Sequence, residues 1–123
     1  PWGFDEPNDT DFYPCNIWQG KFPNKNTASD GYSSTAPAKS FEPNGYGLYN
    51  MAGNVWEWTS NTFRIRSLKK AVKERMKSMA GHRVLKGGSF LCHRSYCWRY
   101  RIAARSGNSP NSSSSHMGFR IIF

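Results

Sequence analysis

The sequence contains few acidic residues in its second half, few cysteines and no long apolar run. Its longest apolar stretches span only a few residues, whereas a membrane helix needs roughly 20. A basic-then-apolar leader is also missing, and the chain begins with proline, so we expect its natural start to lie upstream. A hydrophobic content of 37% and an aromatic content of 15% exclude a disordered chain. With 123 residues, we expect a soluble globular piece of one domain, with no membrane partner.

Acidic residues are concentrated before position 60. Residues 1–60 hold three lysines and seven acids, a balance of −4. Residues 61–123 hold fourteen Lys and Arg and a single acid, Glu74, a balance of +13. A basic half indicates an anionic partner or a missing acidic neighbour. Nucleic acid is the weaker interpretation, because the basic residues are spread through segments of different character and form no groove-reading motif.

Helical periodicity is confined to one segment, SLKKAVKERMKSM. Its apolar residues follow one another at intervals of four, four and three: Leu68, Val72, Met76 and Met79. Ser67 is a suitable N-cap and Gly81 a suitable stop, so we predict a helix over about 67–80. Its other faces are basic. We expect them to face water rather than to dock an acidic partner, because charge runs usually do.

Short strands alternate with turns elsewhere, since eleven Gly and seven Pro divide the chain. Aromatic or β-branched content predicts strands near 55–59, 83–85, 89–92, 98–103 and 118–122. Trp56 and Trp58 share one face of the first strand, which predicts a buried aromatic core. Residues 108–115, NSPNSSSS, are expected to be an ordered loop between two elements. The fold class is therefore α+β with much irregular backbone.

Two of the three cysteines, Cys92 and Cys97, flank the segment CHRSYC. Residues five apart on a strand face opposite sides, so the thiols can meet only if the segment bends. Two thiolates that met would favour a soft ion such as Cu(I), and nearby His93, Arg94 and Arg99 would favour the thiolate form. From the spacing alone, a disulfide or two inert buried thiols are the favoured alternatives.

Side-chain oxygens gather at two places in the first half. Asn50, Asn54 and Glu57 lie in one Gly-containing loop, and Asn16 and Asp30 form a second set. Oxygen ligands in such loops are those that Ca²⁺ prefers. The alternative, favoured on the residues alone, is Asx-turn chemistry, in which these side chains bond their own backbone. Histidine, serine and glycine patterns indicate neither a hydrolase nor a phosphate loop.

Six segments together resemble the formylglycine-generating enzymes, also called sulfatase-modifying factors. They are NIWQG (16–20), DGY (30–32), TAP (35–37), NGYGLYNMAGNVWEWTS (44–60), LKGGSFLCHRSYCWRYRIAARSGNSP (85–110) and GFR (118–120). The likeness runs nearly end to end and is interrupted mainly at the basic helix, where that family varies. The cysteine pair after GGS is the most specific element, because it separates active enzymes of the family from paralogues that lack the thiols.

This resemblance implies the formylglycine-generating-enzyme fold, which is C-type-lectin-like, with residues 1–123 forming the C-terminal part of a single domain. It implies an oxidase that uses O₂ and Cu(I) to convert a cysteine in the CxPxR motif of a nascent or unfolded sulfatase to Cα-formylglycine. The alternative is a non-catalytic, calcium-stabilised binding module of the same fold, which has no need of two thiols beside GGS.

The resemblance also assigns residues. Cys92 and Cys97 would hold Cu(I), and Ser89 would lie near the reacting centre. Substrate-groove positions are matched by His93, Tyr96, Arg105 and His116. One structural Ca²⁺ site is matched by Asn50, Gly53, Val55 and Glu57, and the other by Asn16, Ile17, Asp30 and Tyr32.

The chain departs from the family at several positions. His116 and Asn111 replace a usual Asn and Asp in one loop. Ile102 and Ile121 occupy positions of disulfide-bonded cysteines in the secretory-pathway enzymes, and Cys15 matches no family cysteine. The resemblance therefore implies a bacterial-type cytoplasmic enzyme in a reducing compartment, with Cys15 a free thiol.

Overall fold

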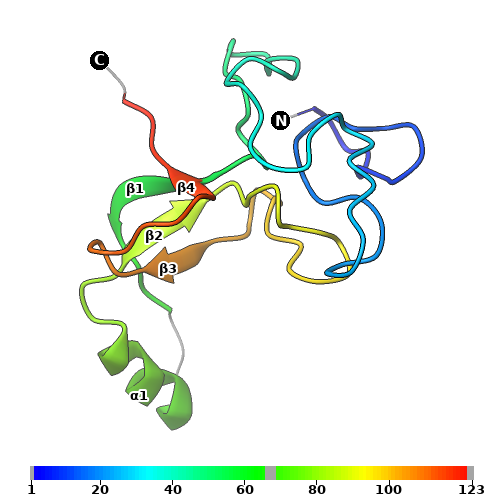
Figure 1. The fold of residues 1–123 in the computed structure, drawn as a ribbon. Helices are drawn as coiled ribbons and strands as arrows, with labels where there is room; N and C mark the ends of the chain where they lie inside the picture. The colour runs from blue at the N-terminus through cyan, green and yellow to red at the C-terminus, as the bar shows by residue number, and fades with distance from the viewer. Residues whose placement is uncertain (1, 66–68, 122–123) are drawn as a thin grey trace.

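Regular structure is concentrated in the second half of the chain. The computed structural model describes residues 2–65 and 69–121. Within these ranges the elements are β1 (Trp56–Thr62), α1 (Lys70–Ser78), β2 (Arg83–Lys86), β3 (Ser106–Asn108) and β4 (Met117–Gly118). Residues 2–55 form turns and loops beside the sheet (Figure 1). The predicted α+β class with much irregular backbone is confirmed.

The four strands form one mixed sheet in the order β3-β2-β1-β4. β1 and β2 are antiparallel, with Glu57 opposite Lys86, and their register shifts between Trp58 and Thr62. β2 and β3 are antiparallel, whereas β4 lies parallel to β1, with Trp56 opposite Met117. The loop 109–116 carries the chain from β3 on one edge to β4 on the other, which confirms the ordered loop expected from NSPNSSSS.

Two of the predicted strands are wrong. Residues 89–92 and 98–103 form turns and irregular segments, because their backbone groups bond within turns, to the loops at Asn54 and Trp18, or to side chains instead of joining a ladder. The His93 carbonyl accepts three nearby N–H groups, and the Lys86 ammonium bonds the carbonyls of Ile102 and Ala104. The strands predicted at 55–59 and 83–85 are confirmed as β1 and β2.

The C-terminal strand is shorter than predicted. Of residues 118–122, only Gly118 lies in β4, because the pairing with β1 ends at Glu57 opposite Gly118, and Ile122 is outside the described residues. β3, with the sequence SGN, was not predicted, since three small polar residues carry no strand pattern. It pairs with β2, and Gly107 makes room there for the ring of Phe63.

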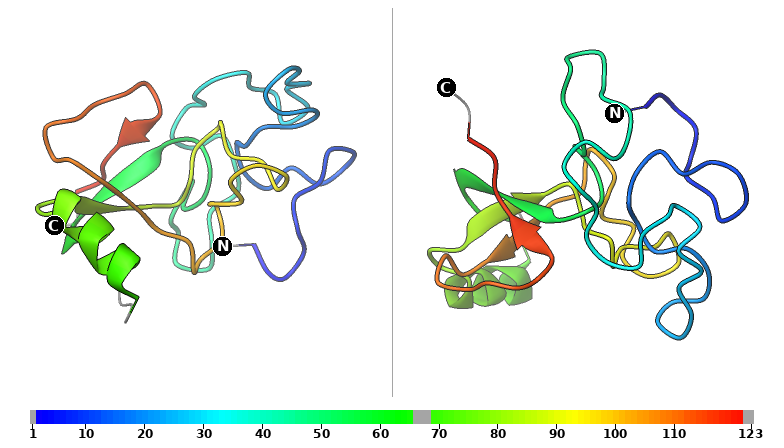
Figure 2. Two further views of the ribbon diagram at one scale, coloured as in Figure 1. Left: turned by 90° about the horizontal axis from the view of Figure 1, so that it is seen from below. Right: turned by 45° about the horizontal axis from the view of Figure 1, so that its top comes forward.

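The predicted helix is confirmed as α1, over residues 70–78. Lys69 is its N-cap and makes no side-chain capping bond, while Ser67 and Leu68 lie outside the described residues. The helix ends at Met79, and Gly81 follows with a φ of 81°. No described strand contacts α1, which extends away from the sheet (Figures 1 and 2). Its basic residues are exposed, as expected of a solvated face.

The core lies where the loops meet the sheet. Its buried members are Cys15, Ile17, Ala52, Cys92 and Tyr100, and Trp2, Trp56, Cys97 and Trp98 pack against them. The buried aromatic core predicted for Trp56 and Trp58 forms only in part, because both are half-buried: Trp56 lies against this cluster and Trp58 lines a cavity. Two of the three thiols thus belong to the core itself.

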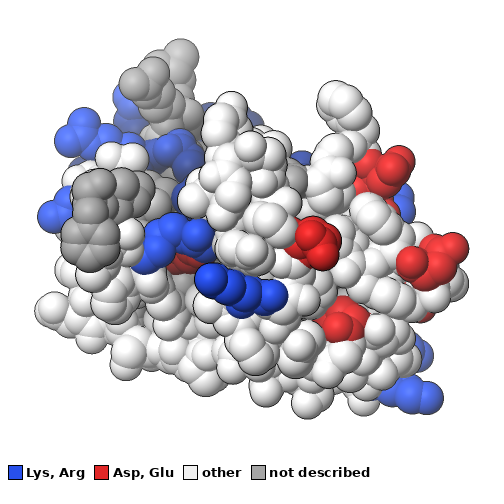
Figure 3. All heavy atoms as spheres, turned by 90° about the horizontal axis from the view of Figure 1, so that it is seen from above, with Lys and Arg blue, Asp and Glu red and all other residues white. Residues whose placement is uncertain are grey.

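The charge separation in the sequence persists in space. On the face shown in Figure 3, most Lys and Arg side chains lie on the side of the sheet and most Asp and Glu side chains on the side of the loops. Among the described residues, no helix combines the length and the apolar character needed to cross a membrane.

Candidate functional site

The two thiols of CHRSYC meet because the backbone between them turns. The carbonyl of His93 accepts the N–H groups of Tyr96, Cys97 and Trp98 at 3.0–3.1 Å, which closes a helical turn between the cysteines. Trp98 then has a φ of 38°, and this reverses the chain. The Cys92 thiol hydrogen-bonds the Cys97 sulfur, so the condition set by the spacing is met and neither cysteine forms a disulfide.

The thiol pair is electrostatically asymmetric. The hydrogen bond from Cys92 lowers the pKa of Cys97 to about 6, helped by backbone N–H groups and the nearby Arg99 guanidinium. The same hydrogen bond, together with burial, raises the pKa of Cys92 above its usual range. At neutral pH the pair therefore holds one proton, carried by Cys92, and one thiolate, on Cys97.

Ser89 and His93 flank the pair. Ser89 is buried, its carbonyl accepts the Cys92 N–H at 2.9 Å, and its hydroxyl accepts the N–H of Leu91 at 3.3 Å. His93 accepts the Ser95 N–H at Nδ1, and its Nε2 lies 3.5 Å from the carboxylate of Asp9. Asp9 carries no sequence signal for this contact, because it is 84 positions away in a polar loop.

An aromatic group lies next to the thiols. The ring of Tyr96 stacks on Phe22 at 4.2 Å, and Phe22 meets Trp18 edge to face at 5.1 Å. The backbone N–H of Trp18 donates to the Cys92 carbonyl at 3.0 Å, which ties this group to the site. Tyr96 is 67% exposed, so one face of the group meets solvent. Sequence reasoning identified Tyr96 but missed Trp18 and Phe22, whose only signal was their place in NIWQGKF.

Two predicted groove residues lie at other places. Arg105 donates to the Arg64 carbonyl at 2.7 Å and lies over the Phe63 ring, near the end of β1. His116 precedes β4, where its carbonyl accepts the Trp56 N–H and its Nδ1 lies 3.1 Å from the Ser114 hydroxyl. The structure brings neither side chain into hydrogen-bonding contact with the thiols, and Arg99 is the cation that acts on Cys97.

The oxygen set around Asp30 lies together in the structure. The Asp30 carboxylate accepts the N–H groups of Ile17 and Tyr32 at 3.1 and 3.0 Å, and the Gln19 amide at 3.1 Å. The neighbouring Asn16 is 1% exposed, and its side-chain oxygen has no hydrogen-bond partner. Burial raises the pKa of Asp30, since desolvation disfavours the carboxylate. A buried, unpartnered oxygen beside a desolvated carboxylate fits a hard cation.

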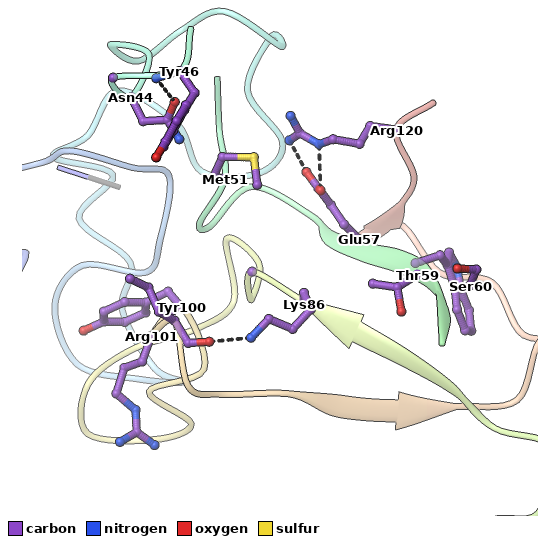
Figure 4. Close-up of a pocket in the computed structure, with 14 residues that line it drawn as sticks. Asn44, Tyr46, Met51, Glu57, Thr59, Ser60, Lys86, Tyr100, Arg101 and Arg120 are labelled. Atoms are coloured by element: carbon purple, nitrogen blue, oxygen red, sulfur yellow. Dashed lines mark hydrogen bonds and ion pairs between the residues drawn. The ribbon is translucent and has the colours of Figure 1, made fainter. Parts of the chain in front are cut away.

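In the second oxygen set, that of Asn50, Gly53, Val55 and Glu57, only some of the oxygens are free to bind a cation. Asn50 has a buried side-chain oxygen without a partner. Glu57, however, is bound by Arg120, whose Nε donates to Oε2 at 2.7 Å and whose Nη2 pairs with Oε1 (Figure 4). Arg120 also donates to the Asn50 carbonyl at 3.4 Å. A cation at Asn50, Gly53, Val55 and Glu57 would share the carboxylate with this guanidinium, so the residues fit Ca²⁺ less well here.

Asn16 and Asn54 do not form the expected Asx turns. The Asn54 side chain bonds both backbone groups of Ala36 and accepts the Asn16 amide at 3.1 Å. The Asn16 amide also donates to the Ser34 carbonyl at 2.8 Å. These bonds join segments 18 to 38 positions apart and hold the two oxygen sets against each other. Asp30 does form an Asx turn, with Tyr32.

Gly53 permits this close approach, and we expect Gly53→Ala to destabilise the fold by about 2–4 kcal/mol. A Cβ at this position would lie 2.3 Å from the Asn16 carbonyl oxygen, and φ is 73°. Denaturation of both proteins in urea measures the difference. Gly45→Ala is the matched control, because it meets nothing within 4 Å. Equal midpoints for Gly53→Ala and the control would contradict the packing described here.

Comparison with known proteins gives a consistent family assignment. Residues 1–123 match the family described as sulfatase-modifying factor enzyme 1-like domain. The chain is 54% identical to the formylglycine-generating enzyme of Streptomyces coelicolor, over 97% of this chain and 38% of that protein. It is 52% identical to the mouse formylglycine-generating enzyme, over 98% of this chain and 32% of that protein.

A solved structure supports the fold. Treponema denticola variable protein 1 superposes with a TM-score of 0.55 and 32% sequence identity, over 75% of this chain and 33% of that one. In these three comparisons the chain spans 32–38% of the length of its relative.

Proposed function

Because the chain belongs to the family of sulfatase-modifying factor enzyme 1-like domains, we propose that it is the thiol-bearing part of an oxidase that converts a sulfatase cysteine to formylglycine. Family membership confirms the fold that the sequence predicted, an α+β domain of the formylglycine-generating-enzyme and C-type-lectin-like type, present in part. Relatives named formylglycine-generating enzyme support a role in sulfatase activation. The single observation that carries the finer proposal is the hydrogen-bonded pair of Cys92 and Cys97.

The donor set of this pair fits a copper(I) cofactor. Cu(I) prefers soft sulfur ligands. Here the Cys97 sulfur is already a thiolate, and the Cys92 thiol donates its proton to that thiolate in a hydrogen bond. Among the described residues, no group of three or more His, Cys, Asp or Glu is placed to hold a metal. Protein ligands at this site would therefore be the two cysteines, and Cu(I) bound there would supply affinity for a substrate thiol and reactivity toward O₂.

The chain's own residues would orient the substrate and keep the thiols reactive. Cys97 would bind as the thiolate that Cys92 and Arg99 stabilise. Ser89 holds the Cys92 backbone, and Tyr96 with Phe22 offers an aromatic surface for a substrate segment such as CxPxR. His93, with its Nδ1 occupied by Ser95, directs Nε2 toward Asp9 at the edge of the site.

The proposed conversion balances with a thiol reductant. Oxidation of the substrate cysteine to a thioaldehyde removes two electrons and two protons from its Cβ–S unit. Hydrolysis then replaces sulfur by oxygen and releases sulfide. Reduction of O₂ to two waters takes four electrons, so the remaining two come from oxidation of two external thiols to a disulfide. The proposal accordingly requires O₂ and a thiol in the assay.

A peptide containing CxPxR tests the proposal. The chain, loaded with Cu(I), is incubated with the peptide, O₂ and a thiol reductant, and the product is identified by mass spectrometry and by trapping the aldehyde with a hydrazide. We expect the aldehyde to form with CxPxR and not with SxPxR. Absence of product from a chain that is folded by circular dichroism and binds Cu(I) would count against an oxidase in this part of the protein.

A non-catalytic binding module is the second candidate function. The superposition on Treponema denticola variable protein 1 supports it, because that protein shares the fold and its name describes no enzyme. Such a module would bind its partner equally well after Cys92→Ala and Cys97→Ala, whereas an oxidase would not act without them.

Calcium is proposed as a structural ion at Asn16, Ile17, Asp30 and Tyr32. The buried, unpartnered Asn16 oxygen and the desolvated Asp30 carboxylate support it. For the Glu57 set, no calcium ion is invoked, because Arg120 already neutralises the carboxylate.

Calcium should raise the thermal stability of the chain, by about 2.7 kcal/mol at a concentration one hundred times the dissociation constant. Asp30→Asn should remove this stabilisation, because it removes the charge that the cation binds, and Glu74→Gln should not, because Glu74 is an exposed acid on α1, which extends away from the sheet. Differential scanning fluorimetry with Ca²⁺ or with a chelator measures both. A calcium response that survives in Asp30→Asn would place the ion elsewhere.

A reducing compartment is also proposed, as expected of a cytoplasmic enzyme. Support comes from the three free thiols and from Ile102 and Ile121, which carry side chains unable to form disulfides.

A further inference from the structure

A cavity of about 890 Å³ lies between the sheet and the loops that carry Tyr46 and Tyr100, and no residue of the aromatic group at the thiols lines it (Figure 4). It is bounded by the turn that carries Tyr46, by β1 at Trp58, and by the turn from Tyr100 to Ile102. Its walls are mainly apolar. Two of its charged side chains are already engaged: Lys86 bonds two carbonyls, and Glu57 pairs with Arg120.

The rim of this cavity exposes large apolar side chains to solvent. Tyr46 is 90% exposed and Ile102 is 79% exposed. Phe119 and Ile121, which flank Arg120 in the sequence, are 73% and 66% exposed. Exposed apolar side chains of this size around an apolar hollow are typical of a contact surface rather than of a face that meets water.

We propose that this surface, defined by Tyr46, Trp58, Tyr100, Ile102 and the cavity between them, docks the polypeptide that the relatives carry beyond the region matched here. The chain matches its family along its entire length, yet it covers only 32–38% of the mouse and Streptomyces enzymes. More than half of each relative is therefore polypeptide with no counterpart in this chain, and one face of this chain is left apolar and hollow. The inference rests on family membership and does not depend on the chemistry at the thiols.

The chemistry of the docked segment follows from the surface. Apolar side chains on the segment would fill the cavity, since its walls are mainly apolar and its Lys86 and Glu57 side chains are paired within the chain. Carboxylates would lie around them, because residues 61–123 hold fourteen Lys and Arg against one acid. On the face shown in Figure 3, most of the basic side chains lie on the sheet side.

Co-expression tests the inference. The chain is produced with a tagged polypeptide made of the Streptomyces coelicolor residues outside the matched region, and the complex is purified through the tag and sized by light scattering. We expect a one-to-one complex. Ile102→Glu and Tyr46→Glu should each weaken it by roughly tenfold or more, because a carboxylate would be buried without a partner. Both positions are exposed in the chain alone, so the variants should still fold.

Ile65→Glu is the control, because Ile65 is also exposed but does not line the cavity. It should leave the complex unchanged, and so should the Cys92→Ser/Cys97→Ser double variant, which separates this inference from the oxidase proposal. Three outcomes would overturn the inference: no co-purification of a folded chain, a complex that tolerates both cavity variants, or self-association of the chain alone that Ile102→Glu abolishes.

Discussion

Cys97→Ser and Cys92→Ser should each lower the affinity for Cu(I) by on the order of a thousandfold or more, equivalent to about 4 kcal/mol. The physical reason is the size of the ligand set: the chain offers two sulfurs in mutual contact, and a hydroxyl is a hard, protonated ligand that Cu(I) binds poorly. Competition with a Cu(I) chelator of known affinity measures the loss. Aldehyde formation on the CxPxR peptide should fall with it to background.

Cys15→Ala provides the matched control for thiol loss. Cys15 is 2% exposed and lies in the same core cluster as Cys92, yet burial raises its pKa and keeps it protonated. Its replacement should cost about 1 kcal/mol of stability, because a small cavity is left. Copper affinity should not change. If Cys15→Ala weakened Cu(I) binding as much as Cys97→Ser does, the two-sulfur site would be wrong.

Cys97 should be the reactive thiol of the folded protein, with an alkylation rate that rises through an apparent pKa of about 6. The other two thiols are buried and have raised pKa values, so they should react slowly below pH 9. Iodoacetamide labelling over a range of pH, followed by peptide mass spectrometry, resolves the three cysteines. Equal labelling of Cys92 and Cys97 at pH 7 would contradict the asymmetry of the pair.

Cys92→Ala should move the Cys97 midpoint upward, toward the ordinary value of 9.0, because it removes the hydrogen bond that lowers the pKa most. Cys92→Ser keeps a donor and should restore part of the shift, although it cannot restore copper binding. At pH 7 the labelling rate should fall only about fivefold in Cys92→Ala, because a more basic thiolate is also more nucleophilic. The midpoint, not the rate at one pH, is therefore the measurement that decides.

The same pKa shifts affect stability, with opposite signs. Between about pH 6 and pH 9 the unfolded chain keeps the Cys97 proton and the folded chain does not, so Cys97 makes the free energy of unfolding rise with pH. Above about pH 9 the unfolded chain loses protons that Cys15 and Cys92 retain when folded, and stability falls again. Urea denaturation at several pH values should show this maximum, and Cys97→Ala should remove the rising part.

Several local features could be predicted from the sequence because short-range rules govern them. The periodicity of Val72 and Met76 predicted α1, and the β-branched and aromatic content of 55–59 and 83–85 predicted β1 and β2. The motif around Cys92 and Cys97 predicted the family, which is confirmed across the chain. The bend needed for the two thiols to meet was stated as a condition, since spacing alone does not decide whether it forms.

Other features depend on partners distant in the sequence. The segments at 89–92 and 98–103 have strand composition, yet the first bonds the backbones of Asn54 and Trp18, and the second is held by the Lys86 ammonium. Asn54 is a residue type that is typical of Asx turns, but its side chain bonds the backbone of Ala36, 18 positions away. No local rule contains these partners, so local propensity was overridden by tertiary hydrogen bonds.

The sequence by itself determined the fold class, the family and the identity of the two neighbouring thiols, because these follow from residue types at fixed spacing. Only the tertiary structure decided which thiol is the anion, that Arg120 neutralises Glu57 while the Asn16 oxygen stays unpartnered, and that one face around Ile102 is hollow and apolar. Each of those properties is set by burial and by distances between segments far apart in the chain, and both come into existence only when the chain folds.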